Sequence, residues 1–390
     1  MTVRRLLSTD ALRLIDGLGP IASTEEAVVA LDRLRKGGVD PELAALALTQ
    51  ARLRARAVAK FGEFARSMLF TEEGLQQATR LGVAARHAAR FRDAGLTVVA
   101  DLGCGIGGDA MAFAGLGLGV RATDRDPDTA AIAAYNLASF PTATVGIGDA
   151  EDADLGSVDG AWLDPARRNG ARRLRDPADW SPPLDFAFGL DIPTGVKLGP
   201  GIDRELIPAG WEAQWVSDAG EVVELAVWSG PLARPGVGRA ALVVTADGAH
   251  ELTAPGDAED APVGALGEYL LEPDGAVIRA RLIGDLARAL GPTARMLHET
   301  IAYVTLDAEP RTPFGRAFRV LDVLPLDAKA VRRALAERGA GAVEVKKRGV
   351  DIDPAAFRRQ LRLAGDPSRS AVVILTRVGE RRRAILAERL

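Results

Sequence analysis

Apolar positions along the chain follow two successive patterns. Over residues 1–92 they recur at helical spacing, as at Leu43, Leu46 and Ala47, among abundant Ala, Leu, Arg and Glu. From Leu96 onward, short apolar runs that end in glycine or aspartate alternate with helical patterns. Such alternation is typical of a parallel, doubly wound α/β sheet of the Rossmann-like kind. We therefore expect a helical N-terminal region over residues 1–92 and an α/β domain over residues 93–255.

The last part of the chain predicts smaller elements. Residues 221–230 and 239–248 are apolar runs that we expect to close the sheet as antiparallel strands. Residues 256–266, rich in Pro, Gly, Ala and acidic side chains, predict a linker. Residues 267–324 then predict a small ferredoxin-like α+β unit, and residues 325–390 predict a second α+β module.

Charge is distributed unevenly along the 390 residues, whose formal net charge is −4. Residues 311–390 hold 19 Lys and Arg against nine Asp and Glu, a net of +10, so the rest of the chain is acidic. A basic terminal module on an acidic body favours a polyanionic partner. A solvated, arginine-rich surface is the alternative, and charge alone does not choose between the two.

Cysteine and histidine contents bear on compartment and metal binding. The single cysteine, Cys104, rules out an internal disulfide and fits a reducing compartment, so we expect a cytoplasmic protein. Three histidines and one cysteine without close ligand spacing give no reason to expect a metal site. There is no run of about 18 apolar residues. Ser8, Asp10 and Arg13 interrupt the first apolar stretch, so we expect neither a membrane span nor a signal peptide.

The stretch "VVADLGCGIGGDA" places Asp101 at the end of a strand, followed by a glycine loop of Gly103, Gly105, Gly107 and Gly108 and then a helix. These glycines also match the dinucleotide pattern, so a nicotinamide enzyme is an alternative. A carboxylate two residues before the first glycine would repel a pyrophosphate but suits a ligand with an ammonium group. S-adenosyl-L-methionine carries an ammonium and a sulfonium and no phosphate, so the sequence favours it as cofactor.

Two further acids end the next two strands. Asp124 lies 23 residues beyond Asp101, the usual place for a carboxylate that accepts hydrogen bonds from a ribose diol. Asp149 ends a third strand and is placed to accept from an adenine amine, with Ile147 or Ala150 against the ring. Each acid alone is an ordinary turn residue. Three of them at successive strand ends predict a ligand site, because open sheets bind ligands at the carboxyl ends of their strands.

Four motifs in order over residues 96–250, "DLGCGIGG", "ATDRD", "GDAED" and "LDPARR", resemble those of class I S-adenosylmethionine-dependent methyltransferases. "LDPARR", "VKLGPGID", "FGRAF" and the basic tail are more specifically similar to bacterial methyltransferases with a C-terminal THUMP-like domain. Those are themselves similar to RNA cap guanine methyltransferases of the trimethylguanosine synthase type. The resemblance implies a seven-stranded methyltransferase sheet in residues 93–255 and a basic THUMP-like domain in residues 325–390.

Asp164, in "WLDPARR", ends the fourth strand beside the expected place of the methyl sulfonium. Amine-modifying members of this class carry an Asp/Asn-Pro-Pro-aromatic tetrad at this strand end. Acceptors on the Asp164 side chain and the following backbone carbonyls would hold the amine hydrogens and aim the nitrogen lone pair at the methyl carbon. Pro165 removes a competing N–H group and stiffens the backbone. We therefore expect Asp164 and Pro165 to be catalytic, through positioning and electrostatics.

The tetrad is altered here, because the sequence is Asp-Pro-Ala-Arg and lacks the aromatic ring that would stack on a flipped base. Arg167 is one substitute, since a guanidinium plane stacks on bases and also meets phosphates. Trp180, in a following loop, is a second stacking candidate. Trp162, on the strand itself, is expected to belong to the core.

Two features beside this site have open interpretations. Lys197, near the end of a fifth strand, resembles a lysine of the THUMP-like family. It would serve either as a phosphate or substrate contact or as a structural ion pair. Residues 60–80, before the sheet, would either close over the donor as a lid or pack as a helix on the domain edge.

The sequence thus favours a methyltransferase that modifies RNA, either rRNA or tRNA, at a base exocyclic amine such as that of guanine. Arg167, Lys197 and Trp180 are its candidate substrate-binding residues. Two alternatives stay open: a methyltransferase of small molecules or proteins, and an RNA-binding protein whose donor site is not catalytic. The oligomeric state is not specified by the sequence.

Overall fold

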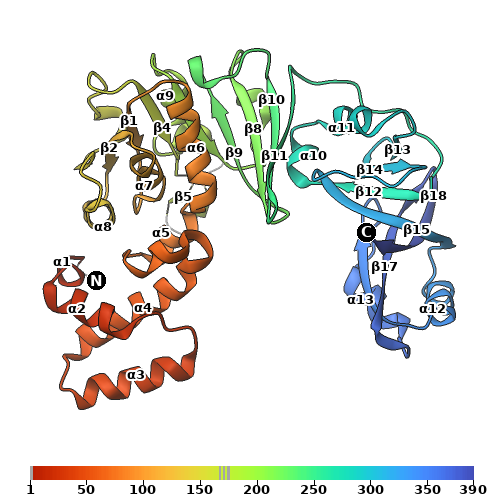
Figure 1. The fold of residues 1–390 in the computed structure, drawn as a ribbon, viewed down its shortest axis with the longest axis horizontal. Coiled ribbons are helices and arrows are strands. Elements are labelled where there is room, and N and C mark those ends of the chain that lie inside the picture. Colours follow the sequence, from red (N-terminus) through yellow and green to blue (C-terminus); the bar gives the residue numbers. More distant parts are fainter. Residues whose placement is uncertain (1–2, 167, 170–171, 174–175) are drawn as a thin grey trace. The chain divides into compact units, whose positions relative to one another are not determined.

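A computed structural model describes residues 3–166, 168–169, 172–173 and 176–390. Contacts divide the chain into two compact units, one of Met1–Leu198 with Val227–Ala233 and the other of Gly199–Ala226 with Arg234–Leu390. The first unit begins with helices (Figure 1), which are Val3–Leu6 (α1), Thr9–Leu18 (α2), Thr24–Lys36 (α3), Pro41–Phe61 (α4), Glu72–Gln77 (α5) and Leu81–Asp93 (α6). None of the helices in the described ranges is both long and apolar enough to cross a membrane.

Side-chain caps explain where these helices begin. Ser23 and Glu26 form a capping box at the start of α3. Asp40 accepts the Leu43 amide at the start of α4, with Pro41 in the first turn. α4 then runs for 21 residues and buries one face. The helical spacing of apolar positions is confirmed for this part of the chain.

A nine-stranded mixed sheet follows, with the order β11-β10-β8-β9-β7-β4-β1-β2-β3. Its strands are Val98–Leu102 (β1), Gly119–Asp124 (β2), Ala143–Ile147 (β3), Gly160–Leu163 (β4), Thr194–Leu198 (β7), Glu212–Asp218 (β8), Glu221–Trp228 (β9), Arg239–Thr245 (β10) and Gly248–Ala254 (β11). β1 pairs in parallel with β2 and β4, β2 with β3, and β4 with β7. The predicted parallel arrangement is confirmed for these five strands, whose carboxyl ends meet at one edge.

The sheet differs from the expected seven strands at its far edge. β10 pairs in parallel with β8, so the prediction that residues 239–248 form an antiparallel finish is wrong. β11 runs antiparallel to β10, paired from Arg239↔Ala254 to Thr245↔Gly248. A two-residue turn between Thr245 and Gly248 makes this hairpin and adds the extra strand. Apolar alternation shows that a segment is a strand but not which neighbour it pairs with.

Helices around the sheet enclose an aromatic core in the first unit. They include Gly108–Gly115 (α7), Pro127–Leu137 (α8) and Leu184–Phe188 (α9), and a two-stranded ribbon of Arg168–Asn169 (β5) and Arg172–Arg173 (β6) follows β4. Trp162 of β4 stacks on Trp228 of β9, with ring centroids 5.5 Å apart. Phe91 of α6 and Phe113 of α7 pack edge-on against Trp162. As expected, Trp162 is a core residue and is fully buried.

The second unit contains a seven-stranded sheet of order β13-β14-β12-β15-β18-β17-β16. Its elements are Tyr269–Pro273 (β12), Gly275–Arg279 (α10), Ile283–Leu290 (α11), Arg295–His298 (β13), Ile301–Leu306 (β14), Gly315–Pro325 (β15), Ala328–Glu337 (α12), Ala340–Lys347 (β16), Pro354–Leu361 (α13), Asp366–Val378 (β17) and Arg381–Arg389 (β18). α12 and α13 cover one core, which holds Val331, Leu335 and Phe357. A second core contains Leu270, Tyr303 and Phe318.

The structure differs from the prediction of two separate small units here. β15 pairs with β12 through its first half and with β18 through its second half, so strands from residues 267–324 and 325–390 share one sheet. The expected boundary between residues 324 and 325 therefore falls inside a strand. Residues 256–266, predicted as a linker, form no helix or strand, but Val263 bridges to Met296 of β13.

The close packing around Gly195 of β7 supports a stability prediction. A Cβ at Gly195 would lie 2.7 Å from both Trp162 and Trp228. Gly195→Ala should therefore lower the free energy of unfolding by about 1–3 kcal/mol through overpacking. Thermal and denaturant unfolding of the full chain measure this.

Gly82, exposed in α6 with open space at its Cβ position, is the matched control. Gly82→Ala should leave the stability unchanged or raise it slightly, because alanine favours a helix. A Gly195→Ala protein as stable as the wild type would show that the aromatic core adjusts without cost.

Candidate active site

A pocket of about 480 Å³ lies in the first unit where β1, β2 and β4 end. The residues named from the sequence that line it are Asp101, Gly103, Gly105, Asp124, Asp149, Ala150 and Asp164. Thr71, Gln77 and Thr79 from the helical region also line it, as does Asp109 of α7. Residues far apart in the sequence thus form one concave site.

The glycine loop between β1 and α7 adopts backbone conformations that favour glycine. Gly103 has a φ of +83° and Gly105 a φ of +56°, with open space at both Cβ positions. Backbone conformation and not crowding therefore requires glycine there. Gly107, also at positive φ, precedes α7 and does not line the pocket; its Cβ would meet Leu137 at 3.4 Å.

Asp101 is buried at the end of β1, with 2% of its surface exposed. Burial raises the pKa of Asp101 well above its ordinary value, and the nearby carboxylates of Asp109 and Asp164 raise it further. Its Oδ2 has no hydrogen-bond partner among the described residues. A buried, unpartnered carboxylate oxygen beside a pocket fits a cationic ligand group such as an ammonium.

Asp124, at the end of β2, is held by two backbone amides. Gly105 N donates to its Oδ2 at 3.0 Å, and Asp126 N donates to its Oδ1 at 2.9 Å. Burial raises the pKa of Asp124 although these amides oppose the rise. Each oxygen keeps a second lone pair, so hydroxyl groups of a ligand can still donate to it.

The adenine end of the predicted site lies after β3. Asp149 and Ala150 line the pocket, and Ala150 is buried. Ile147 is 67% exposed and does not line the pocket, so Ala150 is the side chain placed for a ring contact.

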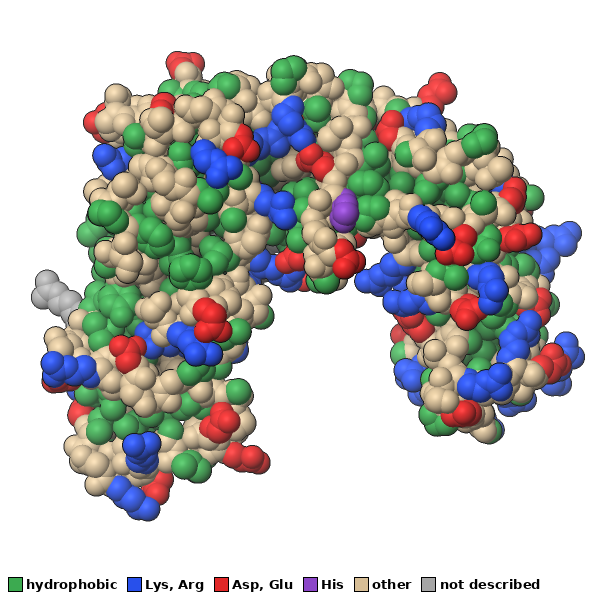
Figure 2. All heavy atoms as spheres, viewed as in Figure 1, with side chains coloured by type: hydrophobic (Ala, Val, Ile, Leu, Met, Phe, Trp, Pro, Cys, Tyr) green, Lys and Arg blue, Asp and Glu red, His purple; other side chains and the backbone are tan. Residues whose placement is uncertain are grey.

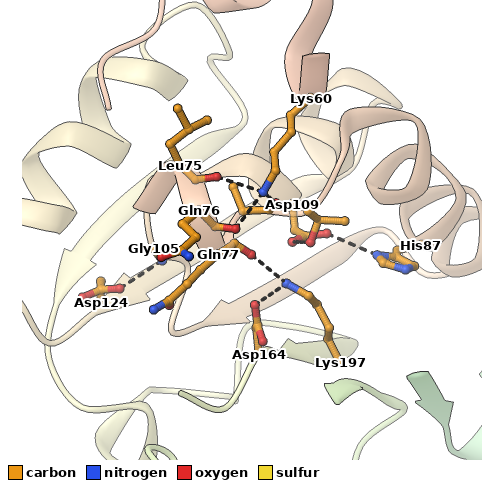
Figure 3. A network of polar contacts seen from close by, with 12 residues as sticks. Lys60, Leu75, Gln76, Gln77, His87, Gly105, Asp109, Asp124, Asp164 and Lys197 are labelled. Carbon is orange, nitrogen blue, oxygen red and sulfur yellow. Dashed lines mark hydrogen bonds and ion pairs between the residues drawn. The ribbon is translucent and has the colours of Figure 1, made fainter. Parts of the chain in front are cut away.

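Asp164 differs from the other Asp-Pro aspartates of the chain. Four of the others accept a backbone amide at the start of a helix and so cap it; these are Asp40, Asp126, Asp176 and Asp353. Asp366 accepts the Ser368 amide in a turn. Asp164 instead receives Lys197 Nζ at 2.5 Å, and the same ammonium donates to the Gln77 carbonyl at 3.3 Å (Figure 3). Of the two interpretations of Lys197, the structure shows the ion pair, and it lies at the pocket.

A further pair, His87 with Asp109, is buried and was not found from the sequence. His87 Nδ1 lies 3.2 Å from Asp109 Oδ1, and Thr79 donates to Asp109 Oδ2 at 2.8 Å. Burial acts to raise the pKa of Asp109, but His87, Lys197 and Thr79 outweigh it and hold the pKa below its ordinary value. The sequence did offer one signal for Asp109. This residue directly follows the glycine loop at the start of a helix, where a carboxylate is favoured.

Residues 60–80 both cover the pocket and pack on the domain. α5 approaches the glycine loop so closely that a Cβ at Gly74 would lie 2.5 Å from Ile106. Lys60 Nζ donates to the carbonyls of Leu75, Gln76 and Ala78 and so holds the end of α5. The segment is thus a packed helix that forms one wall of the pocket, and its closure over the donor stays a prediction.

Three further candidates from the sequence are Trp180, Pro165 and Arg167. Trp180 is 8% exposed and does not line the pocket, whereas Ser181 and Pro182 beside it do. Pro165 is buried next to Asp164. Arg167 lies outside the described residues.

Known proteins share both the sequence and the fold. A family model described as THUMP domain-like matches residues 315–389, and one described as a domain of unknown function (DUF8688) matches residues 1–57. Over 348 residues the chain is 37% identical to a Mycobacterium tuberculosis protein named as an uncharacterized S-adenosylmethionine-dependent methyltransferase, in two strains. The alignment covers 84% of this chain and 91% of the relative. A solved structure from Porphyromonas gingivalis W83, provisionally named a methyltransferase, covers 98% of both chains with a TM-score of 0.76 at 21% identity.

The fold is that of an α/β methyltransferase. The identity to the mycobacterial relatives, over most of both chains, shows that this chain belongs to the S-adenosylmethionine-dependent methyltransferases. S-adenosyl-L-methionine is therefore its methyl donor, and the nicotinamide alternative is excluded. The C-terminal part carries a THUMP-like domain.

The buried Asp101 predicts that donor binding depends on pH. Its pKa is raised in the free protein, and an ammonium group favours the ionised form, so binding should release a proton. The affinity for S-adenosylhomocysteine, which keeps the ammonium, should fall as the pH drops through that raised pKa, by up to about tenfold per pH unit. Calorimetry in buffers of different ionisation enthalpy measures both quantities.

Asp101→Asn is the control for this prediction. It should weaken binding near neutral pH and abolish the proton release. Equal proton release by both proteins would assign the titration to another group.

Proposed function

We propose that this methyltransferase acts on RNA, either rRNA or tRNA, and methylates a base exocyclic amine such as that of guanine. The observation that carries the proposal is the position of Asp164, which ends β4 and lines the same pocket as Asp101. A carboxylate there can accept a hydrogen bond from an amine N–H group. The nitrogen lone pair then points into the pocket, where the methyl group arrives.

The donor would be held by the acids at the strand ends. S-adenosyl-L-methionine supplies a methyl group on a positively charged sulfur. In this proposal Asp101 accepts from its ammonium, Asp124 from the ribose hydroxyls and Asp149 from the adenine amine, with Ala150 against the ring. The open backbone of the glycine loop at Gly103 and Gly105 lets the ligand approach closely, whereas Gly107 lies outside the pocket. The orphaned Asp101 oxygen is the feature that fits a cationic donor best.

The chain's own residues would position the acceptor. A bond forms between the amine nitrogen and the methyl carbon, the carbon–sulfur bond breaks, and one amine proton leaves to solvent. Asp164 holds an amine hydrogen and stabilises the positive charge that grows on the nitrogen. Lys197 is a positioning residue, because its ammonium engages Asp164 Oδ2 and so orients the carboxylate. Pro165 contributes no competing N–H group.

RNA as the substrate is supported by the C-terminal part. Residues 311–390 carry a net charge of +10, and residues 315–389 match the THUMP domain-like model. On the face shown in Figure 2, Lys and Arg side chains are spread over the surface formed by β15–β18 with α12 and α13. Such a surface suits the phosphate backbone, which supplies much of nucleic-acid affinity.

The finer parts of this proposal rest on the sequence motifs. Guanine is suggested by the resemblance to cap guanine methyltransferases of the trimethylguanosine synthase type. Ala166, in place of the second proline, exchanges backbone hydrogen bonds of 2.8 and 3.3 Å with Ser181, which holds this loop at the pocket. Arg167 is the proposed base contact, whereas Trp180 is buried outside the pocket and does not fit the stacking role expected for it. A cytoplasmic location follows from the single cysteine.

Two other functions make different predictions. A methyltransferase of small molecules or proteins should work without residues 311–390 and depend little on salt. An RNA-binding protein with a non-catalytic donor site should bind the donor but transfer no methyl group to any RNA. The pocket placement of the Asp164–Lys197 pair favours catalysis over this last alternative.

Asp164→Ala should abolish most methyl transfer. Incubation of the protein with labelled donor and total RNA, followed by nucleoside mass spectrometry, should show one methylated base whose formation falls about 10²–10³-fold in the variant. Asp32→Ala, in the exposed Asp32–Lys36 pair of α3, is the matched control and should label RNA normally. Equal labelling by Asp164→Ala and the wild type would remove the catalytic assignment.

Replacing Lys197 should lower kcat and leave donor affinity nearly unchanged, because Lys197 acts on Asp164 and does not line the pocket. Lys197→Met should lose about tenfold or more in kcat. Lys197→Arg should recover part of that loss, since it restores the charge. Steady-state kinetics with donor binding by calorimetry separate the two effects, and a loss confined to donor affinity would contradict the positioning role.

A further inference from the structure

A second cavity, of about 800 Å³, opens in the C-terminal unit along α12. One wall is the outer side of α12, and the other is the loop of residues 362–365 that follows α13. Its charged lining residues are four cations, Lys329, Arg332, Arg333 and Arg362, and one acid, Asp327. The cavity is therefore strongly basic.

The acid in the cavity is already engaged. Asp327 caps α12 by accepting the Ala330 amide at 2.8 Å. Arg333 has a long contact of 3.7 Å with Glu337. Within the described ranges, no acidic oxygen lies within ion-pair distance of Lys329, Arg332 or Arg362. The positive charge of the groove is thus largely uncompensated.

The three cations on α12 are not explained by packing. Residues 329, 332 and 333 follow the spacing that puts side chains on one face of a helix, and they are exposed. The opposite face buries Val331 and Leu335 in the core. Like charges four residues apart, as in Lys329 and Arg333, destabilise a helix. An anionic partner would turn this unfavourable arrangement into a favourable one.

Arg362 occupies a position where glycine is usual. It has a φ of +43° and ends α13 in the left-handed conformation. Glycine reaches this conformation without steric cost, whereas an arginine does not. The exposed Arg362 side chain makes no hydrogen bond or ion pair with the described residues that would offset the cost, but it brings a fourth cation to the rim of the groove.

We propose that the groove formed by Lys329, Arg332, Arg333 and Arg362 binds the phosphodiester backbone of the substrate RNA. This inference rests on the proposed function and assigns the binding to one groove of the basic domain. Guanidinium groups suit phosphates, because their paired N–H groups meet two oxygens at once. A concave groove fits a strand that enters it, whereas a flat membrane surface would not reach its lining.

The test compares the full-length wild type with Arg332→Ala/Arg333→Ala and with Arg362→Gly. The probe is a fluorescein-labelled RNA hairpin, and fluorescence anisotropy gives its affinity at several salt concentrations with S-adenosylhomocysteine present. Each lost cation should weaken binding and reduce the slope of log affinity against log salt by about 1. Arg362→Gly should do so without lowering the unfolding temperature, since it relieves the left-handed backbone.

The matched control is Arg381→Ala/Arg382→Ala, which removes two adjacent exposed arginines from β18 of the same domain. It should change the salt slope less than the groove variants do. The inference is overturned if the groove variants bind the hairpin like the wild type, or if the control loses as much as they do. It is also overturned if the groove variants bind the RNA hairpin normally and lose affinity only for inorganic phosphate or for phosphatidylserine vesicles.

Methyl transfer separates this inference from the proposed function. With saturating RNA and labelled donor, the groove variants should regain most of the wild-type rate, because their catalytic unit is intact. If the wild type binds the hairpin through the groove but labels no RNA, the proposed function fails and the groove assignment stands. If the wild type labels RNA while the groove variants bind the hairpin normally, the groove assignment fails and the proposed function stands.

Discussion

Negative charge concentrated at one edge of a sheet is the constraint on which the catalytic unit depends. Parallel strands bring Asp101, Asp124 and Asp164 to a single pocket, and α7, which follows β1, adds Asp109. Carboxylates so close and so buried need compensation. Asp109 obtains it from His87, Asp124 from two amides and Asp164 from Lys197. Asp101 keeps one oxygen without a partner among the described residues, and in our proposal the ammonium of the donor binds there.

The N-terminal helices are part of this site and not an appendage. Extended residues 68–70 are bound by side chains, since Gln50 exchanges two hydrogen bonds with Phe70 and Asn136 exchanges two with Leu69. Asn136 also donates to the carbonyl of Ile106 in the glycine loop. One buried amide therefore joins the N-terminal segment, α8 and the loop. This network explains how α5 can form a wall of the pocket beside the glycine loop.

The two units carry different tasks in one chain. The first contains the acid-lined pocket and the Asp164–Lys197 pair, to which our proposal assigns the donor and the acceptor. The second exposes cations that its own fold does not require, such as those on α12. Like charges held in the open cost stability unless an anion binds them. If the substrate is RNA, as we propose, the methyl transfer and the binding of phosphates are carried by different units.

Local sequence determined which residues would end strands and loops, but pairing across the chain was decided only by the tertiary structure. Asp101, Asp124, Asp149 and Asp164 were identifiable because each directly follows an apolar run, and parallel strands collect their ends at one edge. The His87–Asp109 and Lys197–Asp164 pairs join residues 22 and 33 positions apart, and no short pattern encodes such contacts. For the same reason, the parallel partner of β10 and the double pairing of β15 came only from the fold. A side chain's neighbours along the chain set its conformation, whereas its neighbours in space set its charge, its burial and so its chemistry.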